Sequence, residues 1–356
     1  MRIHKIGEPQ IILSNPCSKH NYFAWPSIVR LQNGKIAVGA SGYRLGHICP
    51  FGKSVMAISE DNGETYTVPM PIIDTVQDDR DVGLCTFGES GLIFTSFNHP
   101  VARHRNWNKG STYEAYRDSY LDLITPEEEA EYVGSIYRVS FDNGVTFGPI
   151  YKSPITTPHG PILLSDGTVL YVGRVFFGRE TDDHIAVYQM HPETGEMTYR
   201  GRIDNIGDGM LSCEPHAIEL SDGSILCHIR VQRTDPKVFT IYQSISHDGG
   251  KTWSKPEAIL DPLDGSPPHL MRHSSGTLIC AYAVREAPYG ILVMFSKDEG
   301  KTWDTNHFLI ENAPSHDLGY PATIELPDHT LLTVYYGLLG KGKNAVIFQQ
   351  KWTLEE

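Results

Sequence analysis

The sequence has little basic charge and no long apolar segment, and each absence excludes a class of partner. It holds 30 Lys and Arg against 43 Asp and Glu among 356 residues, a formal net charge of −13. Broad binding to nucleic acid or to an anionic membrane needs a basic surface, which this composition disfavours. No window approaches the 18 consecutive apolar residues that indicate a spanning helix. We therefore predict neither nucleic acid nor a membrane as a partner.

Cysteine spacing and the first residues argue against two further classes. The six cysteines are scattered and form no CxxC pair, so a structural zinc site is not expected. The N-terminal segment has no long apolar stretch and no small-residue cleavage pattern, so no secretory signal is predicted. We expect reduced thiols, a cytoplasmic location, and no metal or other cofactor.

Turn residues and aromatic residues are abundant, and the turns recur with a period. The chain contains 33 Gly and 23 Pro, with 18 Tyr, 13 Phe and 5 Trp, a composition that favours strands. A turn signal between two apolar runs recurs six times, centred on Gly34, Gly91, Gly167, Gly223, Gly276 and His329. Glycine after Asp or Asn in such a position is the strongest short-range hairpin signal. Six hairpins about fifty residues apart predict an all-β, six-bladed propeller.

A second repeat follows four of the hairpins. The pattern Ser-x-Asp-x-Gly-x-Thr-aromatic begins at Ser59, Ser140, Ser246 and Ser296. It describes a self-contained turn in which the Asp accepts backbone N–H groups and the Gly takes the strained conformation. The gap between hairpin and repeat is longer in the second blade. The excess, about residues 101–132, is predicted to be an inserted loop with one short helix.

The two ends of the chain are predicted to meet in the last blade. Only one further strand follows the sixth hairpin, so that blade lacks an outer strand. The N-terminal strand would complete it and remove the open edge. We expect residues 1–356 to form one propeller domain without a linker.

The repeated turns resemble the Asp boxes of the sialidase (neuraminidase) superfamily of six-bladed propellers. The resemblance covers the whole chain and implies the fold more specifically than the activity, because Asp boxes also occur in propellers that are not sialidases. The box residues themselves are expected to be structural.

Polar residues concentrate where the inner strands begin and the second strands end. Both places lie at the mouth of a propeller, the default position for a site. The candidates for substrate binding there are Arg44, Arg174, Arg230, Arg285, His159, His216 and His269. Glu214 and Tyr320 occupy the same position in blades four and six, each before a proline. A carboxylate beside a phenol can take its proton and make it a nucleophile. Each candidate also has a structural interpretation. Any one arginine could be solvated at the rim, Tyr320 could be a packed aromatic residue, and Glu214 could be a structural carboxylate.

The resemblance assigns roles to four of these residues. Segments similar to those of sialidases imply Tyr320 as the nucleophile and Glu214 as its activating carboxylate. They also imply that Arg230 and Arg285 bind the substrate carboxylate. Sialidases are the glycosidases that use a Tyr nucleophile.

Two positions depart from the sialidase pattern. Ala24 stands where the first substrate-binding arginine is expected, and residues 42–59 contain no carboxylate where the catalytic acid is expected. That stretch carries Arg44, His47 and Lys53 instead.

A run of three acids and one arginine in blade two offers replacements. Like charges so close raise the pKa of one carboxyl, as a general acid at neutral pH requires. We predict Asp79 or Asp81 as the acid and Arg80 or Arg44 as the replacement cation, with Asp78 and His47 also at the substrate. A solvated acidic turn is the alternative. Metal binding by the histidines has no support from tight HxH or HxxxH spacing.

The predicted function is an exo-acting glycoside hydrolase that releases a terminal sialic-acid-like sugar with retention of configuration. One alternative is a propeller glycosidase that uses two carboxylates on an arabinofuranosyl, rhamnosyl or uronic acid residue. Another is a propeller that binds sugar or protein without catalysis. Carbohydrate is the predicted partner. An enzyme requires that Glu214, Tyr320 and the acids of blade two lie within about 5–10 Å of one another in one pocket, whereas a non-catalytic binder does not.

Overall fold

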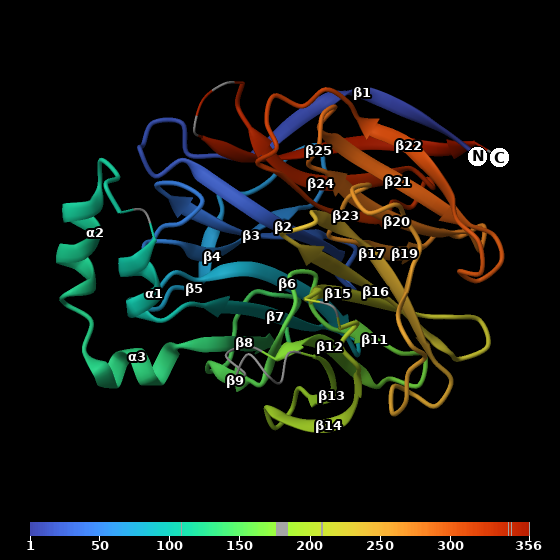
Figure 1. The fold of residues 1–356 in the computed structure, drawn as a ribbon, viewed down its shortest axis with the longest axis horizontal. Coiled ribbons are helices and arrows are strands. Elements are labelled where there is room, and N and C mark those ends of the chain that lie inside the picture. The colour runs from blue at the N-terminus through green and yellow to red at the C-terminus, as the bar shows by residue number, and fades with distance from the viewer. Residues whose placement is uncertain (108, 176–183, 208, 341, 343, 356) are drawn as a thin grey trace.

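The strands form six antiparallel sheets that fan around one axis as the blades of a propeller (Figure 1). The computed structural model describes residues 1–107, 109–175, 184–207, 209–340, 342 and 344–355. The predicted fold class is therefore confirmed.

Blades one to three follow one another along the chain, each from its inner to its outer strand. Blade one contains β2 (Tyr22–Arg30), β3 (Ile36–Arg44), β4 (Lys53–Ser59) and β5 (Met70–Ile73). Blade two contains β6 (Arg80–Phe87), β7 (Gly91–Asn98), β8 (Gly134–Ser140) and β9 (Tyr151–Ser153). Blade three has a divided inner strand and contains β10 (Ile155–Thr156), β11 (Ile162–Leu163), β12 (Val169–Val175), β13 (Ile185–His191) and β14 (Glu196–Ile203).

Blades four to six repeat the arrangement. Blade four contains β15 (Leu211–Glu219), β16 (Ile225–Arg233), β17 (Val238–Ser246) and β18 (Glu257–Ala258). Blade five contains β19 (His269–Arg272), β20 (Leu278–Val284), β21 (Gly290–Ser296) and β22 (Asp304–Ile310). Blade six contains β23 (Leu318–Glu325), β24 (Leu331–Leu338), β25 (Ala345–Glu355) and, on its outside, β1 (Arg2–Leu13).

The N-terminal strand closes the ring as predicted. β1 pairs antiparallel with β25, from Arg2 opposite Glu355 to Leu13 opposite Ile347. The two termini consequently lie side by side (Figure 1). This pairing covers the edge that the last sheet would otherwise expose.

Apolar side chains between neighbouring sheets form the core. All eight residues of β7 are buried, because a strand near the axis is covered on both faces. The cluster between blades six and one includes Trp25, Tyr320 and Tyr336, so aromatic side chains pack up to the axis itself.

Five of the six predicted hairpin turns lie where the turn residues place them. Gly34, Gly167, Gly223 and Gly276 have φ between 82° and 90°, and His329 has φ 65°. The prediction for blade two was wrong by three residues. There Gly88 has φ 53° and makes the turn, whereas Gly91 already begins β7. Two glycines lie close together in that segment, and the spacing alone selects the wrong one.

The four predicted Asp boxes are the self-contained turns that their residues indicate. In the first, Asp61 Oδ1 accepts hydrogen bonds from the Ser59 hydroxyl at 2.8 Å and from the Thr65 backbone N–H at 2.9 Å. The Thr65 hydroxyl donates to Asp61 Oδ2 at 2.6 Å. These hydrogen bonds, led by that of the Thr65 hydroxyl, lower the pKa of Asp61 to about 2.

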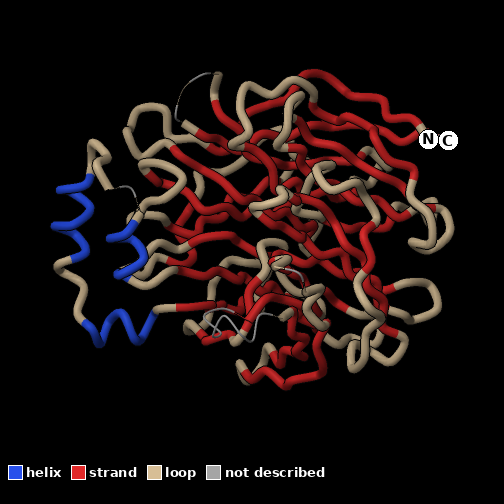
Figure 2. The backbone as a smooth tube through the Cα atoms, in the orientation of Figure 1, coloured by secondary structure: helices blue, strands red, loops and turns tan. Residues whose placement is uncertain are grey.

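The insertion in blade two holds three helices rather than one. They are α1 (Val101–Asn106), α2 (Glu114–Leu121) and α3 (Pro126–Tyr132), and they lie together at one edge of a molecule otherwise built from strands (Figure 2). Thr125 and Glu128 form a capping box at the start of α3, with a proline at its first turn. That signature is legible in the sequence and predicts a helix start.

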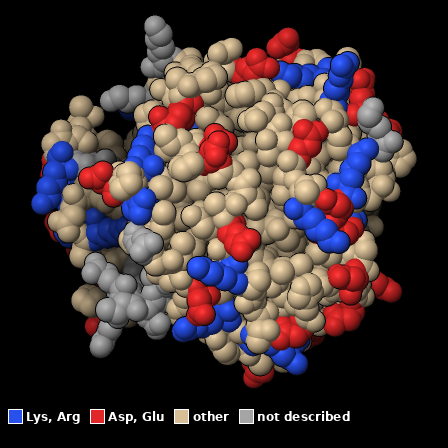
Figure 3. All heavy atoms as spheres, turned by 45° about the vertical axis from the view of Figure 1, so that its right-hand side comes forward, with Lys and Arg blue, Asp and Glu red and all other residues tan. Residues whose placement is uncertain are grey.

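Charges are mixed on the surface. On the face shown in Figure 3, Lys and Arg side chains alternate with Asp and Glu and form no continuous basic area. In the part of the chain that the structure describes, no helix has the length and apolar character needed to cross a bilayer.

We predict that Asp248→Asn in the third Asp box lowers the unfolding temperature by a few degrees at pH 7. The backbone N–H and hydroxyl of Thr252 hold the pKa of Asp248 at about 2, below its value in an unfolded chain. This group therefore stabilises the fold above about pH 4, and the contribution disappears as the pH falls towards 2. Thermal unfolding between pH 2 and 7 measures both effects. The exposed Glu8→Gln is the control, and equal curves for the two variants would contradict the structural role of the box.

Candidate active site

Four inner strands are irregular at the same point near the axis. In β2, β6, β15 and β23 two consecutive residues face one residue of the next strand, a register shift of one that marks a bulge. The first bulged residue of each has positive φ, between 43° and 55°: Trp25, Asp81, Glu214 and Tyr320. Such backbone costs of order 1–3 kcal/mol for a residue other than glycine, and it clusters at functional sites. The repeat thus gives these four side chains equivalent positions in four blades.

Glu214, Tyr320 and Arg230 form one hydrogen-bonded group. The Tyr320 hydroxyl donates to Glu214 Oε1 at 2.6 Å, and Arg230 Nη1 donates to Glu214 Oε2 at 2.5 Å. The same Nη1 lies 3.2 Å from the Tyr320 oxygen. Burial, and then the charge of Glu214, raise the pKa of Tyr320 well above its usual value, against the opposing charge of Arg230. The phenol is therefore neutral and its proton faces a carboxylate.

Asp81 is the acid of blade two whose charge acts on this group. It is 5% exposed, and its Oδ1 has no hydrogen-bond partner among the described residues. Burial raises the pKa of Asp81 to about 7; the charge of Arg80 opposes this shift and that of Glu214 adds to it. The charge of Asp81 also raises the pKa of Tyr320. Asp81, Glu214 and Tyr320 therefore share one electrostatic environment.

The other two acids of that run point elsewhere. Asp79 accepts hydrogen bonds from the Thr75 backbone at 2.7 Å and from the Thr75 hydroxyl at 2.9 Å, which fixes the preceding turn. Burial raises the pKa of Asp79 to about 7. Asp78 is fully buried and forms an ion pair with the equally buried Arg44, whose Nη2 lies 2.9 Å from Asp78 Oδ2.

Arg44 is satisfied within the protein. Its guanidinium also donates to the Ser41 hydroxyl at 2.9 Å and to the His47 carbonyl at 3.0 Å. Burial opposes ionisation of Asp78, but the charges of Arg44 and Arg80 outweigh it and lower the pKa of Asp78 to about 2. Arg44 therefore neutralises Asp78 beneath the site.

Arg80 extends over the indole of Trp25. Its guanidinium carbon lies 4.0 Å from the ring centroid, a cation–π contact. Arg80 Nη1 donates to Asp78 Oδ2 at 3.2 Å and to the His47 carbonyl at 3.0 Å, while Nε has no partner among the described residues. Ala24 beside it is fully buried and offers no charge.

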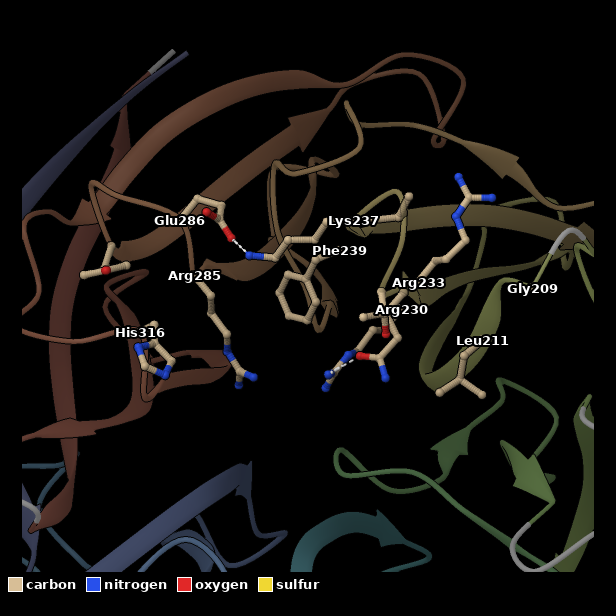
Figure 4. Close-up of a pocket in the computed structure, with 13 residues that line it drawn as sticks. Gly209, Leu211, Arg230, Arg233, Lys237, Phe239, Arg285, Glu286 and His316 are labelled. Atoms are coloured by element: carbon tan, nitrogen blue, oxygen red, sulfur yellow. Dashed lines mark hydrogen bonds and ion pairs between the residues drawn. The ribbon is translucent and has the colours of Figure 1, made fainter. Parts of the chain in front are cut away.

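Arg230 and Arg285 face the same open space. Their guanidinium carbons lie 4.8 and 5.4 Å from the ring centroid of Phe239, which stands between them (Figure 4). Arg285 Nε donates to the Leu318 carbonyl at 3.1 Å, but its buried Nη2 has no partner in the described structure. Both line a cavity of about 720 Å³, whose rim carries the ion pair of Lys237 with Glu286.

The remaining predicted residues lie around this centre. His47 is exposed, and its Nδ1 lies 3.1 Å from Asp317 and 2.9 Å from the Tyr22 hydroxyl. Arg174, at the end of β12, lies on the side of the insertion. Burial lowers the pKa of Arg103 in α1, and the charges of Arg174 and Arg80 lower it further.

His159, His216 and His269 are buried together beneath the site. The ring of His159 lies 6.4 Å from that of Tyr320. Among the described residues, no group of three or more His, Cys, Asp or Glu is arranged to hold a metal ion.

The sequence pattern of residues 124–334 matches the family described as BNR repeat-like domain. The chain belongs to this family. Its six blades make it a BNR propeller. No curated protein matches the chain.

Several solved structures share the fold of this BNR propeller. A protein of unknown function from Dyadobacter fermentans superposes with a TM-score of 0.79 at 18% identity, covering 99% of each chain. The NanB sialidase from Streptococcus pneumoniae gives 0.70 at 13% identity, covering 98% of this chain and 71% of that one. The intramolecular trans-sialidase from Ruminococcus gnavus gives 0.66 at 13% identity, covering 97% of each. At these identities the likeness shows the fold alone.

Three features of the propeller mouth were missed in the sequence. Trp25 supports Arg80, and Phe239 separates Arg230 from Arg285. Asp317 accepts hydrogen bonds from the Tyr22 hydroxyl at 2.8 Å and from the Tyr336 hydroxyl at 3.0 Å. Asp317 and Trp25 both lie where inner strands begin, so their place in the repeat could have identified them; Phe239 has no such signal.

We predict that Arg44→Met destabilises the BNR propeller by about 3 kcal/mol, because it leaves Asp78 buried with less compensation. Chemical denaturation measures the change. Adding Asp78→Leu to Arg44→Met should recover part of the loss, since the uncompensated charge is then removed. A stability within about 0.5 kcal/mol of wild type for Arg44→Met alone, the usual range for a neutral surface change, would show that Arg44 is not a structural partner of Asp78.

Proposed function

We propose that this BNR propeller is a retaining, exo-acting glycoside hydrolase that removes a terminal acidic sugar of the sialic acid type. The observation that carries the proposal is the 2.6 Å hydrogen bond from the Tyr320 hydroxyl to Glu214 at the propeller mouth. Structural neighbours described as a sialidase and as an intramolecular trans-sialidase support the same class of reaction.

In the first step, the Tyr320 oxygen attacks the anomeric carbon and its proton passes to Glu214. The raised pKa of Tyr320 means that the proton leaves during the attack rather than before it. Arg230 Nη1, 3.2 Å from the phenolic oxygen, stabilises the negative charge that develops there. The bond from the anomeric carbon to the leaving group breaks, and Asp81 protonates the departing oxygen.

In the second step, water replaces Tyr320 at the anomeric carbon. Asp81, now ionised, takes a proton from this water, and the departing Tyr320 oxygen recovers its proton from Glu214. Two displacements at the same carbon retain its configuration. Asp81 suits this double role better than Asp79, whose oxygens are held by Thr75.

The charges around the nucleophile favour an acidic sugar. Arg285 Nη2 is buried without a partner in the described structure, and Arg285 and Arg230 line the same cavity on either side of Phe239, so the two can bind a carboxylate together. Arg80 would supply the cation that is missing at Ala24, held by the Trp25 ring and by Asp78. A neutral phenol is also better suited than a carboxylate to attack a carbon that already bears a carboxylate.

We predict that Tyr320→Phe lowers the rate of hydrolysis of an aryl α-sialoside by about a thousandfold or more, because the nucleophile is lost. Release of the aryl alcohol measures turnover. The control is Tyr335→Phe in the same blade, whose ring stacks on Phe348 in the core. Activity of Tyr320→Phe equal to that of the control on any aryl glycoside would move the chemistry to a mechanism with two carboxylates.

We predict that kcat/KM falls as the pH rises through about 7, because Asp81 must carry a proton to act as the acid and burial raises its pKa to about 7. Asp81→Asn should abolish this alkaline limb. It should also lower kcat/KM by about 10²- to 10⁴-fold for alkyl sialosides, and less for aryl sialosides with better leaving groups. An unchanged alkaline limb in the variant would exclude Asp81 as the acid.

A further inference from the structure

Three buried imidazoles meet on the axis below Tyr320. His159, His216 and His269 come from blades three, four and five, and are 2%, 7% and 8% exposed. The rings of His216 and His269 stack, with centroids 4.6 Å apart and planes at 17°. His159 meets both edge-on, at 5.5 and 5.0 Å.

Backbone hydrogen bonds fix the tautomer of the two stacked rings. The Leu270 N–H donates to His216 Nδ1 at 2.9 Å, and the Thr323 N–H donates to His269 Nδ1 at 3.3 Å. A backbone N–H can only donate, so each Nδ1 is an acceptor and the proton of each neutral ring is on Nε2. These two histidines therefore offer N–H donors rather than the lone pairs that a metal ion needs.

His159 has ring nitrogens that make no hydrogen bond to the described residues. Both of its ring nitrogens are buried and lack a hydrogen-bond partner in the part of the chain that the structure describes. A neutral imidazole always carries one N–H, so at least one donor here is unsatisfied. A buried polar group without a partner costs about 1–3 kcal/mol, and it commonly marks a missing ligand or water.

The three rings line a cavity of about 220 Å³. Its other walls come from residues that follow the bulges of the inner strands, on the side towards the hairpin turns. They are predominantly apolar, and include Ile28, Leu84, Ile162 and Ala217. Glu219, the carboxylate on this wall, is occupied by the backbone and hydroxyl of Ser165 at 2.6 and 2.9 Å. The cavity thus combines three imidazole rings with walls that are mainly apolar.

We propose that this cavity is a second binding site, separate from the catalytic mouth, for a small carboxylate with a short apolar chain. The two oxygens of the carboxylate accept hydrogen bonds from Nε2–H of His216 and His269 and from His159. The chain lies along the apolar wall. The site uses neither Tyr320 nor the arginines, so it does not depend on the proposed hydrolysis.

The test uses isobutyrate as the probe and isobutanol as its neutral counterpart of similar shape. Protein labelled with ¹⁵N at histidine is titrated with each at pH 7, and the imidazole signals are followed by NMR. We expect the imidazole signals to shift with isobutyrate until one molecule is bound per chain. Isobutanol should bind at least about tenfold more weakly. Equal binding of the two probes, or no shift with isobutyrate, would overturn the proposal and leave water as the occupant.

Two variants locate the site. His159→Phe keeps an aromatic ring and removes the unpartnered nitrogens, and should weaken isobutyrate binding about tenfold or more. Arg285→Ala in the catalytic mouth should leave the affinity within about twofold of wild type, because it lies outside this cavity. Loss of binding in Arg285→Ala would show that the carboxylate binds at the arginines instead. The comparison of isobutyrate with isobutanol uses the wild-type protein and decides the question even if His159→Phe fails to fold.

Discussion

The hydrogen bond between Tyr320 and Glu214 joins blades four and six, which are not neighbours and meet only at the axis. It therefore requires a closed ring of the right circumference. The pairing of β1 with β25 supports this closure, because it ties the segment that precedes blade one to blade six. Both residues also lie at bulges with positive φ, so two strained backbone sites aim one phenol at one carboxylate.

Local charge at the mouth opposes the charge of the whole protein. The net charge of −13 repels an anionic sugar at long range, and salt screens that repulsion. At short range, Arg44 cancels Asp78 and Arg230 lies against Glu214, so these cations are already engaged. The buried Nη2 of Arg285 has no such partner in the described structure. The capacity of the mouth to bind an anion therefore rests most on this group.

The repeat made most of the fold predictable. Hairpins and Asp boxes are made by local turn chemistry, so single residues such as Gly34 and Asp61 mark them in the sequence. The same register placed Glu214 and Tyr320 in equivalent positions of two blades, which predicted their proximity. The error at Gly91 arose because Gly88 satisfies the same local rule.

The details of the site were harder to predict, because they depend on backbone conformation and on contacts between blades. Residues before proline normally avoid the helical region and favour extended backbone. The positive φ of Trp25, Glu214 and Tyr320, each followed by proline, therefore runs against the local rule. Asp81 lies at such a bulge, whereas Asp79 precedes it and is held by Thr75, and composition alone does not separate these two acids.

The covalent bond from Tyr320 to the sugar is the step on which the proposed mechanism depends most. A fluorinated sialosyl fluoride, which slows the second displacement more than the first, allows this intermediate to accumulate for peptide mapping by mass spectrometry. We expect one added glycosyl group per chain, on the peptide that contains Tyr320. The same group on the peptide of Glu214 or Asp81, or full turnover without any labelled peptide, would contradict the tyrosine mechanism.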